Sequence, residues 1–358
     1  MPITEVVMNI KEAIGRVVLG TDLTEIEMYG VMNGIMSGEA TPAQIGSFIT
    51  ALRMKGETVD EITGAVRVMR EKATHLDTGV DVKGGEVLMD IVGTGGDGAG
   101  SFNVSTTTSF VVAAAGVPIA KHGNRAVSSH CGSADVLEAL GIDLNLSPAS
   151  MAECVRSVGI GFLFAPMLHK AMKYAIGPRR EIGIRSIFNI LGPMTNPAGS
   201  NVQLTGVFSQ GLTRTVAEVL VRLGIKRALV VWGEGNLDEL TITGTTHVAD
   251  GYQGKVTCYT LEPEDFGLCR GTLHDIRGGR TPAAAALQVR EVLSGEEGPK
   301  LDMVLLNAGG ALYAAGRVAS IQAGVDLARD IIRSGAATEK LEQLIRFSRS
   351  LVKAQPLG

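Results

Sequence analysis

Apolar residues recur every three or four positions through the first 76 residues, a spacing typical of amphipathic helices. Helix-start signals, in which a capping residue precedes an acidic or amide residue by three positions, occur at Asp22 with Glu25, at Thr41 with Gln44 and at Thr58 with Glu61. Pro42, directly after Thr41, also favours a helix start. The pattern predicts a helical domain of about four helices over residues 1–76.

From Gly85 onward, short apolar runs alternate with helical stretches and end in glycine or polar residues. The runs are EVLMDIV (86–92), GVPIAKHG (116–123), NVQLTGVFS (201–209), KRALVVWG (226–233) and LDMVLLNAGG (301–310). Continuous apolar strands separated by helices are typical of a buried parallel sheet. Residues 77–358 are therefore predicted to form a larger α/β domain with a mostly parallel central sheet. Ligands of such sheets bind at the carboxyl ends of the strands.

The composition agrees with a globular protein of two domains, since 45% of the 358 residues are hydrophobic and 20% are charged. The four cysteines form no C-x-x-C pair and the six histidines no H-E-x-x-H motif, which argues against a structural zinc and favours a reduced, cytoplasmic protein. No signal peptide or membrane span is expected. The formal charge of -4 argues against broad nucleic-acid binding, so an anionic ligand should be small.

A glycine-rich loop, GTGGDG at 93–98, follows the first of these runs. Its Gly93-x-Gly95-x-x-Gly98 spacing matches a dinucleotide-binding loop, but also other loops that wrap a phosphate. Bare backbone N–H groups and a helix expected to begin near Asn103 favour an anion. A tight turn that needs glycine only for its positive φ angles is the alternative.

The next strand ends in Lys121-His122-Gly123-Asn124-Arg125. A dinucleotide fold would have an acidic residue there to bind the ribose hydroxyls, whereas a lysine and an arginine suit phosphate. A P-loop is excluded because no G-K-[ST] follows the glycines. Three serines just before the next amphipathic helix either cap that helix or contact the ligand: Ser128, Ser129 and Ser133.

Two further groups of charged residues are candidates for the site. Asp238 and Glu239 follow an apolar strand, and are either solvated surface carboxylates or ligands of Mg²⁺, with Ser105 as an added hydroxyl. Arg179 follows Gly177-Pro178, which is expected to form a turn at a helix start, and could hold a carboxylate with its guanidinium.

These motifs together resemble those of anthranilate phosphoribosyltransferases: GTGGDG, NVST, KHGNRAVSS, GSADVLEALG, GPRREIGIRSIFNILGPMTNPA and LDEL. The resemblance extends over essentially the whole chain. It implies the nucleoside-phosphorylase-like fold, in which a later segment near 167–191 joins the helical domain, and a homodimer formed through that domain. It also implies transfer of the phosphoribosyl group of 5-phosphoribosyl 1-diphosphate (PRPP) to anthranilate in tryptophan biosynthesis, with Mg²⁺ and without a covalent nucleophile.

The resemblance also implies roles for individual residues. PRPP would be bound by Gly93, Gly96, Asp97, Ser101, Asn103, Val104, Ser105, Thr106, Lys121, His122, Gly123, Asn124, Arg125, Ala126, Val127, Ser128, Ser129 and Ser133. Anthranilate would be bound by Gly93, Asn124 and Arg179, and Mg²⁺ by Ser105, Asp238 and Glu239. His130 and Cys131 replace a lysine and a serine found in many relatives, which leaves contacts by these two side chains open.

Two other functions fit the same architecture. A pyrimidine nucleoside phosphorylase would carry the motif KHSTGG, which this chain lacks. A non-catalytic homologue that binds nucleic acid should have lost the metal and acceptor residues and should be basic, whereas this chain keeps Asp238, Glu239 and Arg179 and is acidic.

Overall fold

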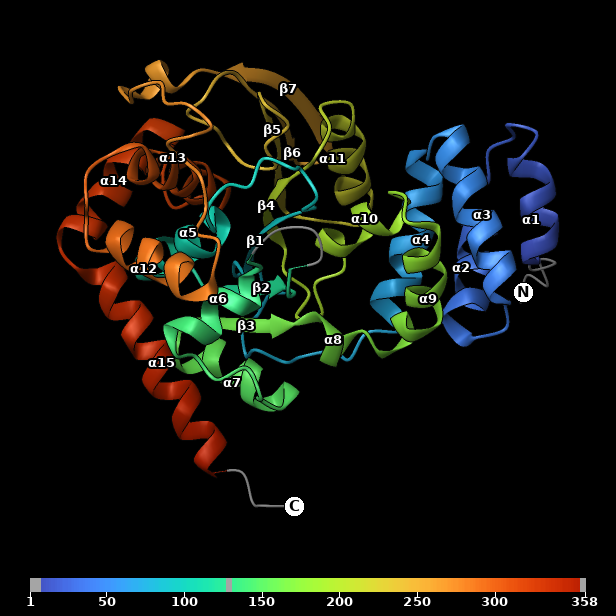
Figure 1. Ribbon diagram of the computed structural model, residues 1–358, viewed down its shortest axis with the longest axis horizontal. Coiled ribbons are helices and arrows are strands. Elements are labelled where there is room, and N and C mark those ends of the chain that lie inside the picture. The colour runs from blue at the N-terminus through green and yellow to red at the C-terminus, as the bar shows by residue number, and fades with distance from the viewer. Residues whose placement is uncertain (1–7, 127–130, 355–358) are drawn as a thin grey trace. The chain divides into compact units, whose positions relative to one another are not determined.

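The computed structural model describes residues 8–126 and 131–354 of the chain. It contains two compact units, which are shown in Figure 1 and described separately here. The first extends to Thr74 and also includes His169–Thr195. The second consists of His75–Leu168 and of the chain from Asn196 onward.

The first unit is entirely helical over its described residues. It contains α1 (Ile10–Val17), α2 (Glu25–Ser37), α3 (Pro42–Lys55), α4 (Val59–Glu71), α9 (Lys173–Ile182), α10 (Phe188–Leu191) and two short 3-10 turns, Lys170–Met172 and Gly192–Met194. Helix α2 packs against α4, α1 packs against α3, and the returning helix α9 packs against α2 and α3.

Two of the three predicted helix starts in this unit are confirmed, because Thr41 and Thr58 each form a reciprocal capping box. The start predicted at Asp22 is wrong. Thr24 caps α2 instead: its hydroxyl accepts the Glu27 N–H at 3.3 Å, and the Glu27 carboxylate accepts the Thr24 N–H at 2.9 Å. The Asp22 carboxylate is paired with the Lys55 ammonium at 2.6 Å.

The turn predicted at Gly177-Pro178 is also wrong, because α9 begins at Lys173 and continues through Pro178. A proline at this depth removes one main-chain hydrogen bond of the helix. Ala175 and Pro178 are the buried residues of α9, and the helix packs against its neighbours in the unit. Burial of this face therefore outweighs the loss of one hydrogen bond, and Arg179 lies within a helix.

The second unit is built around one seven-stranded sheet of order β3-β2-β1-β4-β5-β6-β7. Its strands are β1 (Met89–Gly93), β2 (Ile119–Gly123), β3 (Ile160–Phe164), β4 (Val202–Gly206), β5 (Arg227–Gly233), β6 (Thr246–Tyr252) and β7 (Lys255–Leu261). The first five strands are parallel, while β6 and β7 pair antiparallel at one edge. The prediction of a mostly parallel sheet is confirmed.

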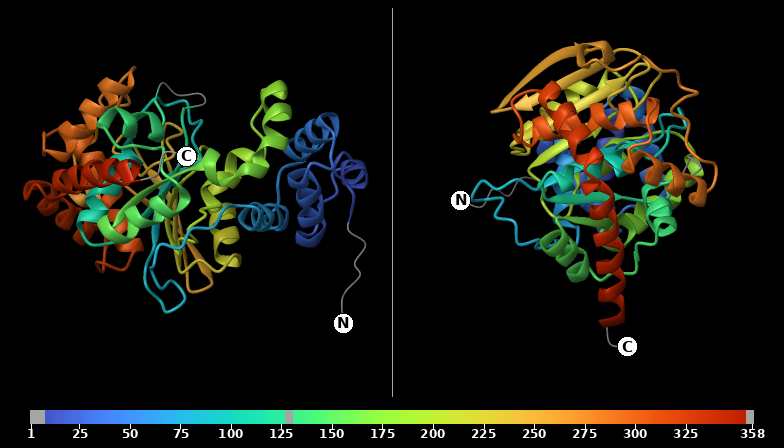
Figure 2. Two further views of the ribbon diagram at one scale, coloured as in Figure 1. Left: turned by 90° about the horizontal axis from the view of Figure 1, so that it is seen from below. Right: turned by 90° about the vertical axis from the view of Figure 1, so that its left-hand side faces the viewer.

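Helices cover the sheet, as the two views of Figure 2 show. They are α5 (Val104–Ala114), α6 (Ser133–Leu140), α7 (Pro148–Val158), α8 (Ala165–Leu168), α11 (Leu212–Arg222), α12 (Pro282–Leu293), α13 (Pro299–Ala314), α14 (Ile321–Arg333) and α15 (Ala336–Ala354), with a 3-10 turn at Pro263–Phe266. Helix α5 packs on β1 and β2, α13 on β4 and β5, and α11 on β5 and β6.

The strand predicted at 301–310 is wrong, since these residues lie in helix α13. A continuous apolar run does not distinguish a buried strand from a helix buried on all sides. Two glycines let α13 and α14 approach closely: a Cβ on Gly324 would lie 2.5 Å from the Gly309 carbonyl oxygen. Strands β3, β6 and β7 are not among the strands that the apolar runs predict.

Among the residues that the structure describes, no helix is long and apolar enough to cross a membrane.

A buried histidine predicts a pH dependence of the helical unit. Burial lowers the pKa of His169 to about 4, whereas the unfolded chain has a pKa near 6.5. Between these values the unfolded state binds the additional proton, so stability should fall as the pH is lowered from about 6.5 to about 4, by up to roughly 3 kcal/mol. Thermal denaturation at several pH values should show a flatter profile in this window for His169→Gln. An unchanged slope in that variant would contradict this assignment.

Candidate functional site

The glycine loop after β1 has the backbone conformation that its sequence suggests. Gly95, Gly96, Gly98 and Gly100 have φ angles of +66°, +70°, +75° and +64°. Side chains other than glycine rarely adopt this region, so the turn itself explains these four glycines. A ligand is not needed to account for them, and it is the groups around the loop that indicate one.

Asp238 and Glu239 follow β5 and lie against the glycine loop. The Asp238 carboxylate accepts the Gly95 N–H at 2.7 Å. The Glu239 carboxylate accepts the Ser105 N–H at 3.2 Å, in the first turn of α5. Asp238 is 8% exposed. The interpretation as a solvated surface carboxylate is therefore wrong for Asp238, whereas Glu239 is half-buried.

Two further glycines make room for Asp238. A Cβ on Gly93, the last residue of β1, would overlap the Asp238 carboxylate. A Cβ on Gly206, the last residue of β4, would overlap the Asp238 main-chain carbonyl. At Gly206 the overlap is with main-chain atoms, so only glycine admits the acidic loop there, whereas a side chain at position 93 would force the Asp238 carboxylate to turn away.

The loop that carries the pair is fixed from behind by Asn307 of α13. Its side-chain oxygen accepts the Leu240 N–H at 3.1 Å, and its amide nitrogen donates to the Leu240 carbonyl at 2.7 Å. Asn307 is fully buried. The acidic pair is thus attached to a rigid helix and is preorganised.

The carboxylates of Asp238 and Glu239 lie in surroundings that disfavour their charged forms. Burial, together with repulsion from Asp97, raises the pKa of Asp238 to about 7. Burial and the Asp238 charge raise the pKa of Glu239 well above its ordinary range. Both shifts reflect carboxylates that lack sufficient compensation by cations. A divalent cation would supply it.

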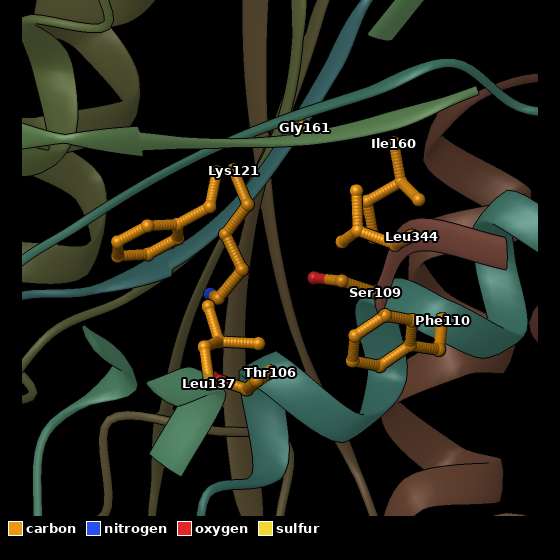
Figure 3. A pocket seen from close by; sticks show the side chains of 9 residues that line it. Thr106, Ser109, Phe110, Lys121, Leu137, Ile160, Gly161 and Leu344 are labelled. Atoms are coloured by element: carbon orange, nitrogen blue, oxygen red, sulfur yellow. The ribbon is translucent and has the colours of Figure 1, made fainter. Parts of the chain in front are cut away.

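Lys121 is the buried cation of this region. From β2 its ammonium donates to the Ile91 carbonyl at 2.7 Å and to the Ser105 hydroxyl at 3.2 Å. Burial lowers its pKa, although the charges of Asp90, Glu239 and Asp238 oppose that shift. Figure 3 shows the side chain extending toward the helix of Thr106, beside a void of ≈ 10 Å³. That void is too small for a substrate.

A second cluster lies where β2 leads into α6. The Asn124 carbonyl accepts the Ser133 hydroxyl at 3.2 Å and the Ala134 N–H at 3.2 Å. The Arg125 guanidinium, predicted to meet phosphate, is paired with Glu138 at 2.8 Å. A phosphate would have to compete with this carboxylate for Arg125.

The other predicted donor residues lie close to these two clusters. The Asn103 side chain donates to the Cys131 carbonyl at 3.3 Å, which joins the start of α5 to the loop before α6. Val104 and Thr106 are buried in α5, and Ser101 forms an isolated β-bridge with Arg277. The Asp97 carboxylate accepts the Ala99 N–H at 3.1 Å, and the Ala126 N–H donates to Asp135 at 3.0 Å.

Four positions discussed in the sequence analysis lie outside the described residues, and one predicted site residue lies in the helical unit. Val127, Ser128, Ser129 and His130 belong to the undescribed segment. Arg179 lies in the helical unit, where its guanidinium carbon is 5.1 Å from the centre of the Phe188 ring. Burial lowers the pKa of Arg179.

Three buried polar residues near the site were not predicted from the sequence: Asp90, Asn196 and Asn307. Each is buried and each fixes main-chain groups at the edge of the sheet that carries the site. A signal was available, because Asp90 and Asn307 interrupt otherwise apolar runs. Buried polar residues of this kind are normally hydrogen-bonded for a structural or functional reason.

The donor set fits a metal that shares its coordination with a ligand. Within 8–126 and 131–354, no group of three or more His, Cys, Asp or Glu side chains could hold a metal ion. Mg²⁺ is commonly bound by one or two carboxylates together with phosphate oxygens and waters. Asp238 and Glu239, with the Ser105 hydroxyl nearby, match that requirement in chemistry.

A larger groove of ≈ 510 Å³ lies at the opposite ends of the strands. It is lined by residues that precede β1, β2 and β3, among them Val87, Pro118 and Gly159. Sheets of this kind bind their ligands at the carboxyl ends of the strands. The candidate site is therefore the edge with the glycine loop and the acidic pair.

Comparison with protein families assigns both parts of the chain. Residues 11–73 match the helical bundle domain of a glycosyl transferase family, and residues 85–338 match the a/b domain of such a family. The two matches together define a two-domain glycosyl transferase.

Individual relatives narrow this class. Anthranilate phosphoribosyltransferase from Desulfotalea psychrophila is 68% identical over 340 residues, which are 95% of this chain and 97% of that protein. The structure of anthranilate phosphoribosyltransferase from Thermus thermophilus has a TM-score of 0.88 and 45% identity, over 94% of this chain and 99% of that one. The chain belongs to the anthranilate phosphoribosyltransferase family.

A more distant relative has been solved with ligands. Anthranilate phosphoribosyltransferase from Saccharomyces cerevisiae, in complex with PRPP and Mg, is 27% identical with a TM-score of 0.84, over 96% of this chain and 98% of that one. The same yeast protein has also been solved in complex with 4-fluoroanthranilate.

The close approach of Asp238 to β1 predicts separable effects of two glycine substitutions. Gly93→Ala places a methyl group on the Asp238 carboxylate and should break its hydrogen bond to the Gly95 N–H. Amide hydrogen exchange at Gly95 should then accelerate. Gly95→Ala meets no protein atom within 4 Å, and should only add backbone strain of about 1–2 kcal/mol, visible as a lower melting temperature. Unchanged exchange at Gly95 in the Gly93→Ala protein would contradict the steric argument.

Proposed function

We propose that this enzyme transfers the 5-phosphoribosyl group of PRPP to the amine of anthranilate and releases pyrophosphate, as a step of tryptophan biosynthesis. The observation that carries the proposal is the acidic pair beside the glycine loop of a member of this family, in which buried Asp238 binds Gly95 and half-buried Glu239 binds Ser105 at the start of α5. An acidic pair at a phosphate-binding loop would repel the donor unless a cation lies between them.

In the proposed reaction the lone pair of the anthranilate nitrogen forms a bond to the anomeric carbon. The bond from that carbon to the diphosphate oxygen breaks, and its electrons leave with pyrophosphate. The nitrogen then loses one proton to solvent. An aromatic amine is neutral at pH 7, so the enzyme needs no strong base, and catalysis depends on alignment and on charge stabilisation at the leaving group.

Different segments of the α/β unit are proposed to bind different parts of the donor. The glycine loop with Gly93, Gly96 and Asp97, and the start of α5 with Asn103 to Thr106, are proposed to hold the diphosphate. The segment from Lys121 to Ala126, together with Ser133, is proposed to complete the donor site. Val127 to Ser129 are assigned to it from the family motif alone.

Asp238, Glu239 and Ser105 are proposed to hold Mg²⁺. When bound, the ion would neutralise negative charge on the diphosphate. The pair is ready to receive it, because main-chain N–H groups and Asn307 already hold the carboxylates and their loop in place. Lys121 adds a fixed positive charge on the same side of the sheet.

Gly93, Asn124 and Arg179 are proposed to bind anthranilate. This assignment is carried over from the family motifs. The geometry of Arg179 supports it only in part: its guanidinium lies over the Phe188 ring, which leaves the planar edge with its N–H groups for a carboxylate.

The competing functions are less well supported. A pyrimidine nucleoside phosphorylase would carry the motif KHSTGG at 121–126, whereas this chain has KHGNRA there. A nucleic-acid-binding homologue would have no use for an acidic pair of which Asp238 is buried against the glycine loop.

We further propose a cytoplasmic homodimer that forms through the helical unit. Seven large apolar side chains of this unit are exposed: Val18, Leu19, Ile26, Met54, Tyr174, Ile176 and Ile184. Exposed apolar residues that belong to neighbouring helices are typical of an interaction surface. The four cysteines are free thiols, as in a reducing compartment.

Removal of the acidic pair should abolish turnover without unfolding the protein. We expect Asp238→Asn/Glu239→Gln to lose at least about 10³-fold in kcat, because several kcal/mol of leaving-group stabilisation would be lost with the metal. Loss of anthranilate fluorescence measures the rate. The matched control is Glu264→Gln/Asp265→Asn, an exposed adjacent pair in the 3-10 turn after β7, which should keep full activity. Full activity of the first variant, or of the wild type in excess chelator, would refute the metal assignment.

Substitution of Arg179 should raise the KM for anthranilate and leave the KM for PRPP nearly unchanged. We expect Arg179→Ala to raise the KM for anthranilate by roughly ten- to a hundredfold, the effect of losing about 1.5–3 kcal/mol of charged hydrogen bonding. Arg179→Lys should recover only part of it, because an ammonium does not hold a carboxylate in a fixed plane. Arg180→Ala, the neighbour in α9, is the control. An equal rise in the KM for PRPP would assign Arg179 to the phosphate site.

A further inference from the structure

Strands β1 and β2 are paired only where they begin. Met89 is the single residue of β1 in register with β2, opposite Ile119, and its N–H donates to the Pro118 carbonyl at 2.9 Å. By contrast, β1 and β4 are in register over all five residues, and so are β2 and β3. The sheet is therefore open at one place, between the carboxyl halves of β1 and β2.

The opening lies where a further rung would be expected. In a parallel ladder each paired residue donates to the carbonyl that precedes its partner and accepts from the N–H that follows it. The next pair after Met89 and Ile119 would be Ile91 and Lys121. That rung would use the N–H and carbonyl of Ile91, the carbonyl of Ala120 and the N–H of His122.

Side chains bind these backbone groups instead. The His122 N–H donates to the Asp90 carboxylate at 3.1 Å, and the Ile91 N–H is hydrogen-bonded to the same carboxylate. The Ala120 carbonyl accepts from the Asn196 amide at 2.8 Å. As described above, the Ile91 carbonyl accepts from the Lys121 ammonium.

Asp90 and Asn196 act as one unit in this gap. The Asn196 amide nitrogen donates to the second Asp90 oxygen at 2.7 Å, and the Asn196 oxygen accepts the Ala198 N–H at 2.9 Å. Asp90 is fully buried and Asn196 is 5% exposed. Both carboxylate oxygens of Asp90 thus accept hydrogen bonds, and the pair replaces the missing rung without leaving its polar groups unsatisfied.

We propose that Asp90 and Asn196 are positioning residues of the donor site, which hold the carboxyl ends of β1 and β2 apart and so set the spacing of the two loops that bind the diphosphate. The inference rests on the proposed function. A continuous ladder would bring the strands to about 4.8 Å from each other along their whole length. The glycine loop continues from β1 and the Lys121 loop from β2, so this spacing decides whether both can contact one diphosphate.

The gap between β1 and β2 also provides the position in which the Lys121 ammonium lies. In the gap it donates to the Ile91 carbonyl, which a complete ladder would have given to the His122 N–H, and to the Ser105 hydroxyl. Loss of Asp90 or Asn196 should allow β2 to shift toward β1 and should disturb Lys121 and the loop after it. Of the proposed acceptor residues, Arg179 belongs to the helical unit, outside this sheet, whereas Gly93 and Asn124 lie at the ends of β1 and β2.

The first test separates donor from acceptor kinetics. For Asn196→Ala and Asp90→Asn we expect the KM for PRPP to rise by roughly tenfold or more, and the KM for anthranilate to rise by a smaller factor, because only Gly93 and Asn124 of its proposed contacts lie at these strand ends. The matched control is Asp250→Asn, which alters a similarly buried carboxylate that pairs with Arg227 at 2.6 Å on β6. If Asp250→Asn with a similar loss of melting temperature raised the KM for PRPP equally, or if the first two variants left it unchanged, the positioning role would be refuted.

The second test does not depend on turnover. Calorimetric titration with magnesium pyrophosphate should show weaker binding to Asn196→Ala than to the wild type, and hydrogen exchange at the His122 amide should accelerate in Asp90→Asn. Normal pyrophosphate binding by Asn196→Ala would overturn the inference. Failure of the wild type to use anthranilate would instead refute the proposed function, and the titration would remain decisive for the pair. Asn196→Ala removes no charged group, so it serves if Asp90→Asn does not fold.

Discussion

The close approach of one acidic loop to the ends of two parallel strands is the constraint on which the candidate site depends. Asp238 lies so near β1 and β4 that a single added carbon at Gly93 or Gly206 would overlap it. These two strands are neighbours in the sheet although β2 and β3 lie between them in the sequence, and they mark the point where the strand order reverses. Ligands of α/β sheets bind at such a point.

The same approach explains why charge accumulates here. The carboxylates of Asp238 and Glu239 and the ammonium of Lys121 lie where water is largely excluded. Burial raises the pKa of both carboxylates and lowers that of the ammonium, which in each case favours the neutral form. Such a site is costly in the absence of its ligands, and hydrogen bonds from Gly95, Ser105 and Asn307 offset that cost only in part. A divalent cation with a polyanion would balance the charges, which is the physical link between this geometry and the activity of the family.

The sheet itself is adapted to this edge. Its parallel pairing is complete between β1 and β4 but stops after one residue pair between β1 and β2, where Asp90, Asn196 and Lys121 bind the backbone groups left over. Buried polar side chains that replace main-chain hydrogen bonds can hold strands at a distance that a regular ladder does not allow. The fold thus keeps its strand order while the two loops above it are spaced by side chains.

The sequence by itself determined the local features, because they depend on neighbours along the chain. The period of the apolar residues distinguished a helical from an α/β region, Thr41 and Thr58 marked helix starts, and the glycine motif marked a turn with positive φ angles. The combination of motifs also pointed to the correct family. Tertiary structure decided what depends on packing: that 301–310 is a helix enclosed by other elements and that α9 continues through Pro178. It also decided that Asp238 is buried and that Asp90 meets Asn196, 106 residues later, since contacts between distant segments leave no periodic signal in the chain.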